Sequence, residues 1–129
     1  MNKTAGNFMK AGVIYALAGF ILGVAMGATH EFALRSVHTH LNLIGWASMA
    51  IYAMYYQLVP AATRSALAKA HFWLANLGLV VLTASVALLS RGVSAAEPGA
   101  AIGSMVSLAA LLVFAYIVFS TSGMSEQRG

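Results

Sequence analysis

Residues 38–60 read HTHLNLIGWASMAIYAMYYQLVP, an apolar run with two histidines at its start and a proline at its end. The run is long enough to cross a lipid bilayer as a helix, and a proline commonly marks where such a helix stops. Ionisable side chains are costly inside a membrane unless they have a function or a partner. His38 and His40 are therefore the first candidates for a functional site.

The two histidines are expected on nearly opposite sides of this helix. Helical positions two residues apart are separated by about 200°, so His38 and His40 cannot easily hold one small metal ion together. Helical spacing places Asn42 and Gly45 on the face of His38, where small and polar residues could line a flat cofactor. The same spacing predicts a more aliphatic face for His40, made of Ile44, Ala47, Ile51 and Met54. An interfacial or hydrogen-bonded histidine remains the alternative for either residue.

The whole chain has the composition of a membrane protein. Of its 129 residues, 60% are hydrophobic and 8% are charged, which lies outside the usual range of soluble domains. Cysteine is absent, so disulfides, thiolate ligands and covalent attachment of a c-type heme are excluded. The net charge of +4 comes from scattered residues, and without a basic cluster nucleic acid is not an expected partner.

Four apolar segments predict an all-α membrane protein with one domain, residues 1–129. We expect transmembrane helices at about residues 8–29, 37–59, 68–90 and 100–121, each of a length that can cross the bilayer. The side that holds both termini would carry most of the positive charge. It would hold Lys3, Lys10, Arg64, Lys69 and Arg128, whereas the other side would hold Arg35 and Arg91. This bias predicts a bacterial-type inner membrane protein with both termini in the cytoplasm.

The string HTHLNLIGW, followed by YYQLVP and KAHFWLANLG, resembles the catalytic subunit of the heme-copper oxidases and of their nitric oxide reductase relatives. The resemblance covers residues 35–79 and is closest to the second helix and the start of the third helix of that family. In the family a His-x-His pair supplies one ligand to a low-spin heme and one to a high-spin heme. The resemblance therefore implies heme b, held noncovalently, with His38 and His40 as iron ligands.

The same resemblance limits the chemistry expected of one chain. The family needs three further histidines for copper, whereas this chain has only His30 and His71 left, so a complete oxygen-reducing site is not expected. Ligation by two histidines favours electron transfer, and ligation by one leaves a position open for O2 or NO. The chain could be an oxidoreductase or an electron-transfer protein, and the sequence does not choose between them. A quinone or another redox carrier is a possible partner.

Several residues near the histidine pair have two interpretations. Arginines at this membrane face hold heme propionates in the family, so Arg35 is a candidate for that role, with a loop surface or pairing with Glu31 as the alternative. Gly19, Gly23 and Gly27 recur every four residues and could admit either another helix or a porphyrin plane. His30 lies near the same face and could ligate a heme within one chain, together with one member of the pair.

Residues of the third predicted span have simpler expectations. His71 should lie about 20–30 Å from His40 in depth, too far to bind the same iron, and we expect it at the membrane interface beside Trp73. Asn76 is the most polar residue inside this span and should hydrogen-bond a neighbouring helix.

The length of the chain suggests an oligomer. The family subunit has about twelve helices in three arcs of four, and this chain is long enough for one arc. Three copies, a symmetric homotrimer, would rebuild a similar body. His38 of one chain and His40 of the next could then be the two ligands of one iron, with the hemes between protomers.

Two other functions compete with heme binding. In one, the histidines and some of the seven methionines form a site for copper handling. In the other, the chain binds no cofactor and is an assembly subunit of a larger respiratory complex. An absorption spectrum separates these functions, because heme gives a Soret band.

Overall fold

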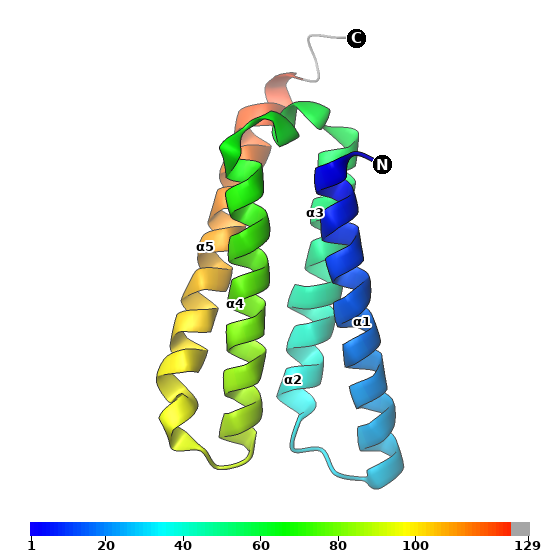
Figure 1. Ribbon diagram of the computed structural model, residues 1–129, viewed down its shortest axis with the longest axis vertical. Helices are drawn as coiled ribbons and strands as arrows, with labels where there is room; N and C mark the ends of the chain where they lie inside the picture. Colours follow the sequence, from blue (N-terminus) through cyan, green and yellow to red (C-terminus); the bar gives the residue numbers. More distant parts are fainter. Residues whose placement is uncertain (125–129) are drawn as a thin grey trace.

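The computed structural model describes residues 1–124, which are helical almost throughout and contain no strand (Figure 1). The predicted all-α fold is confirmed. The chain begins with α1 (Lys3–Thr29) and continues through α2 (Arg35–His40), the π-helical segment η1 (Leu41–Ala47) and α3 (Ser48–Leu58). After the short η2 (Pro60–Arg64) come α4 (Ala66–Ser90), η3 (Ser94–Ala96), α5 (Glu97–Thr121) and η4 (Ser122–Met124).

In the described residues, three helices, α1, α4 and α5, are long and apolar enough to cross a membrane. This is fewer than the four long helices expected. The difference arises at residues 37–59, where the helical run is divided into α2, η1 and α3, of 6, 7 and 11 residues. Periodicity alone could not reveal this change of helix type, because the residues of η1 and of α3 after it are both predominantly apolar.

Helix ends differ from the predicted bounds where caps or turns were missed. α1 begins at Lys3 instead of residue 8, because the side chain of Asn2 accepts a hydrogen bond from the amide of Ala5 at 2.9 Å. The Asn2 amide group also donates to the carbonyl of Tyr56 at 2.7 Å, which joins the start of α1 to the end of α3. α5 begins at Glu97 instead of residue 100, with a proline in its first turn, where proline is tolerated.

The helices form two antiparallel pairs, α1 with α2–α3 and α4 with α5. Both loops inside these pairs lie at the end of the molecule opposite the N-terminus (Figure 1). Glu31 in the first loop pairs with Arg91 after α4 at 3.9 Å, and both side chains are exposed. Glu31 therefore does not form the alternative pair with Arg35, whose guanidinium lies 5.6 Å from the centre of the Phe32 ring.

The α4–α5 pair is held by close backbone contact at glycines. A Cβ atom added to Gly103 would lie 2.5 Å from the backbone nitrogen of Leu82, and one added to Gly78 would lie 2.8 Å from that of Ser107. Helices in lipid associate mainly through such close packing of small residues. Any side chain at either glycine would force the two helices apart.

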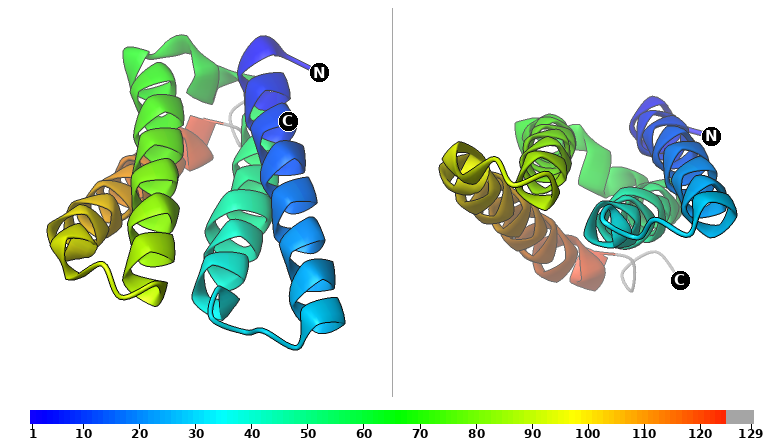
Figure 2. Two further views of the ribbon diagram at one scale, coloured as in Figure 1. Left: turned by 60° about the horizontal axis from the view of Figure 1, so that its bottom comes forward. Right: turned by 90° about the horizontal axis from the view of Figure 1, so that it is seen from below.

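The two pairs also meet through polar groups. The Tyr15 hydroxyl donates to the Asn76 side chain at 2.7 Å, which confirms the expected bond from Asn76 to a neighbouring helix. α5 runs obliquely to α4 (Figure 2), and at its C-terminal end Thr121 lies 2.7 Å from the Tyr55 hydroxyl of α3. The four helical runs therefore form one bundle.

The packing of α5 on α4 can be tested with two alanine substitutions. Gly103→Ala should lower the free energy of unfolding by about 1–3 kcal/mol, because a methyl group meets the backbone of α4. Gly6→Ala is the matched control, since nothing lies within 4 Å of a Cβ atom there and alanine favours a helix. Unfolding of the detergent-solubilised variants, followed by circular dichroism, measures both. Equal stability of the two variants would contradict the close contact.

Candidate functional site

His38 is held against α1 by a hydrogen bond that selects its tautomer. Its Nδ1 atom lies 2.7 Å from the carbonyl oxygen of Gly19. A carbonyl only accepts, so Nδ1 must carry the hydrogen and Nε2 keeps its lone pair. The ring lies over Gly23, where an added Cβ atom would be 2.7 Å from Cε1. His38 is thus a half-buried imidazole with a fixed orientation and a nitrogen available for a metal.

His40 is arranged in the same way on another face of the helix. Its Nδ1 atom lies 2.7 Å from the carbonyl oxygen of Ser36, one turn earlier, so Nδ1 again carries the hydrogen and Nε2 has the lone pair. In the described residues, neither Nε2 atom of the pair makes a hydrogen bond. Sequence reasoning missed Ser36, although its place four residues before His40 was a usable signal.

His40 also lines a groove between α2–α3 and the α4–α5 pair. The groove has a volume of about 280 Å³ and extends from His40 to Tyr52, about 18 Å along the helix. Its other wall is largely apolar, with Leu82 from α4 and Leu108 and Leu111 from α5. The outward histidine therefore stands at one end of a long groove with an apolar wall.

The π-helical segment η1 begins directly after His40 and shapes this groove. In an α-helix, His40 and Tyr52 would point about 120° apart, yet both line the groove together with Ile44 and Ser48. A π turn holds more residues than an α turn, so each residue rotates the chain less. Positions four apart therefore stay aligned. The α-helical spacing had instead predicted Ile44, Ala47, Ile51 and Met54 on the His40 face, and Ile51 and Met54 are exposed.

Asn42 and Gly45 lie on the His38 face as predicted, but they pack against helices. The Asn42 side chain donates to the His38 carbonyl at 2.8 Å and fills the space over Gly19. Gly45 is covered by Tyr15 and by a side chain of α4. This face is therefore filled by side chains of the same chain, and the glycine groove of α1 receives side chains of α2 and η1.

Arg35 and His30 lie at the same end of the bundle as the histidine pair. Arg35 is exposed at the first position of α2, one turn before His38. His30 ends α1 in a left-handed conformation, with φ 54°, and is exposed. Gly27, two residues before the end of α1, has open space beside it.

His71 is not the interfacial histidine that was expected. It has 0% exposure, and its ring is surrounded by the aromatic rings of Phe8, Tyr52, Tyr56 and Phe114, with centroids 4.4–5.9 Å away. The neighbouring Trp73 is 54% exposed. Residues that are two positions apart on a helix point to nearly opposite sides. The sequence did not show whether His71 or Trp73 faced the bundle.

The buried His71 makes one hydrogen bond. Its Nδ1 atom lies 2.9 Å from the Tyr56 hydroxyl, whereas its Nε2 atom has no partner in the described residues. Tyr56 lies 18 positions after His38, which is about 27 Å along the helix. The separation in depth from the histidine pair is thus consistent with the expected distance, and His71 belongs to the aromatic core.

The titratable groups do not gather into a cluster. Within residues 1–124, no three His, Cys, Asp or Glu side chains lie close enough to hold one metal ion. Each histidine of the pair therefore offers a single nitrogen to a ligand. Comparisons with protein family models, curated proteins and solved structures found no match. The features that bear on function are therefore the geometry of the two imidazoles and the groove beside His40.

Proposed function

We propose that the chain is an integral membrane heme b protein, resembling a minimal heme-copper oxidase subunit, in which His38 and His40 are iron ligands. Its role would be electron transfer or the binding of a small gas such as O2 or NO. The observation that supports this proposal most is that both imidazoles donate from Nδ1 to a backbone carbonyl at 2.7 Å. This arrangement is typical of metal-binding histidines, because it fixes the ring and raises the basicity of Nε2.

The residues around the pair suit a heme. Iron in heme accepts the lone pair of a neutral imidazole, and both Nε2 atoms can supply one. The apolar wall of the groove suits the face of a porphyrin, and Arg35 is placed where a propionate could be bound. When bound, heme supplies a redox-active iron, while the chain orients the imidazoles and excludes water.

The proposal includes four membrane crossings, with α2, η1 and α3 together making the fourth. Residues 35–58 are helical without a break, and each π or α hydrogen bond satisfies the backbone inside lipid. Both the N-terminus and the end of α5 lie opposite the loops (Figure 1). Lys3, Lys10, Arg64 and Lys69 share that end, which favours a cytoplasmic side there. Arg128, the fifth residue of the charge argument, lies outside the described residues.

The topology is tested with reporter fusions. A reporter enzyme that is active only in the periplasm should be inactive when fused to the C-terminus, because the proposed topology has that end in the cytoplasm. The same reporter inserted at Gly92, in the turn after α4, should be active and is the positive control. Activity at the C-terminus would contradict the proposed orientation.

Heme ligation is tested by removing each imidazole. The purified protein should show a Soret band, and His38→Ala or His40→Ala should remove heme or change its spin state. His71→Leu is the control, because it removes a buried imidazole far from the pair. A heme spectrum lost in the folded His71 variant and kept in the other two would contradict the assignment. A protein that never takes up heme would favour copper handling or an assembly role.

The opposite directions of the two histidines support the proposal that heme is shared between protomers. His38 contacts α1 and His40 faces the groove beside α5, so one protomer does not bring both Nε2 atoms to one iron. A homotrimer in which His38 of one chain and His40 of the next bind the same heme would use both nitrogens. The exposed apolar side chains on all of the long helices leave room for such contacts or for lipid.

The shared site is tested by the mass and heme content of the protein in mild detergent. We expect a trimer with one heme per protomer that loses heme when it dissociates, because each iron would need two chains. His30→Ala should leave heme bound, since His30 has no role in this arrangement. A heme-loaded monomer that requires His30 would support ligation within one chain and contradict the shared site.

A further inference from the structure

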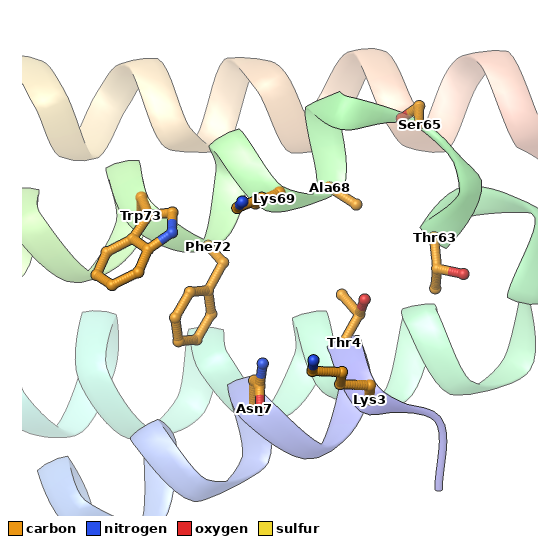
Figure 3. Close-up of a pocket in the computed structure, with 9 residues that line it drawn as sticks. All are labelled: Lys3, Thr4, Asn7, Thr63, Ser65, Ala68, Lys69, Phe72 and Trp73. Carbon is orange, nitrogen blue, oxygen red and sulfur yellow. The ribbon is translucent and has the colours of Figure 1, made fainter.

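A second pocket lies at the end of the bundle that holds the N-terminus. It has a volume of about 380 Å³ and is bounded by the first turns of α1, by η2 and by the start of α4. Figure 3 shows the side chains of α1 on one side and those of η2 and α4 on the other, with open space between them. Its polar lining includes Lys3, Thr4, Asn7, Ser65 and Lys69.

These five polar side chains have unused hydrogen-bonding groups. None of them makes a side-chain hydrogen bond or a salt bridge to another residue in the part of the chain that the structure describes. By contrast, the side chain of the nearby Asn2 both donates and accepts a hydrogen bond. The Thr63 hydroxyl donates to the carbonyl of Pro60. The pocket therefore offers donors that its own walls do not satisfy.

The charge of the pocket is positive and uncompensated within the described residues. Lys3 and Lys69 bring two ammonium groups from different helices to opposite walls (Figure 3). The acidic residues that the structure describes, Glu31 and Glu97, lie at the loop end of the bundle (Figure 1). A ligand with net negative charge is favoured here, and a zwitterionic headgroup finds no described carboxylate for its cation.

The apolar side of the pocket distinguishes a lipid from a free anion. Trp73 borders the pocket and is 54% exposed, and Leu77, one turn further along α4, is 56% exposed. Tryptophan is typical of the membrane–water boundary, with leucine below it at the level of the acyl chains. A molecule with its anionic group between the lysines could lay a hydrocarbon chain along this strip of α4.

We propose that this pocket binds the phosphodiester headgroup of an anionic phospholipid. Lys3 and Lys69 hold the phosphate charge, the hydroxyls of Thr4 and Ser65 donate to its oxygens, and Trp73 contacts the start of an acyl chain. Basic pockets between transmembrane helices are known to hold such headgroups. The site is separate from the histidine pair, and it does not depend on whether the chain binds heme.

The test measures which lipid stays bound to the full-length protein. The protein is placed in nanodiscs with equal amounts of phosphatidylglycerol and phosphatidylcholine, released, and analysed by native mass spectrometry. We expect phosphatidylglycerol to be retained preferentially. In the double variant Lys3→Gln with Lys69→Gln, the loss of each lysine should lower phosphatidylglycerol retention about fivefold. The double variant Lys3→Arg with Lys69→Arg should retain phosphatidylglycerol as the unmodified protein does. Circular dichroism checks that every variant remains folded.

The control removes equal charge from the same end of the bundle. Lys10→Gln with Arg64→Gln changes two exposed residues that do not line this pocket, and it should leave retention within about twofold of the unmodified protein. An equal loss in this variant would mean a general attraction to the basic surface and would overturn the site. Equal retention of both lipids would also overturn the site. The same holds if inorganic phosphate stabilised the protein as much as phosphatidylglycerol does.

Discussion

Helices in a lipid bilayer gain little from burying apolar side chains, so their association depends on close packing at small residues. In this protein that packing occurs at glycines. Gly23 and Gly19 let α2 and η1 approach α1, Gly45 receives Tyr15, and Gly103 brings the backbone of α5 against α4. The orientation of His38 follows from the first of these contacts, because its ring needs the space over Gly23 to reach the carbonyl of Gly19.

The three histidines of the bundle that are at least partly buried have different surroundings, and these suggest different roles. His38 and His40 each donate to a backbone carbonyl and keep an unbonded Nε2 atom that is not fully enclosed. His71 is completely enclosed by aromatic rings and is bonded to Tyr56. An imidazole that a cofactor can reach must keep one nitrogen accessible, so only the first two histidines meet this requirement.

The sequence predicted what depends on apolar length and on helical spacing. It predicted the all-helical fold, the opposite directions of His38 and His40, and the bond from Asn76 to another helix. It missed η1, because a π turn leaves no clear mark in an apolar segment, and it therefore misplaced the residues that share a face with His40. It also misplaced His71, because the side of α4 that faces the bundle depends on the other helices.

Tyr52 belongs to two surroundings at once. It forms the far end of the groove that begins at His40, and its ring also packs against His71 at a centroid distance of 4.4 Å. A ligand that enters the groove and moves this tyrosine must also change the packing of the buried imidazole. Tyr52 would then couple the two regions thermodynamically. A change in the packing of the aromatic core would alter the binding free energy of a ligand in the groove by the same amount as the ligand alters the free energy of that packing change.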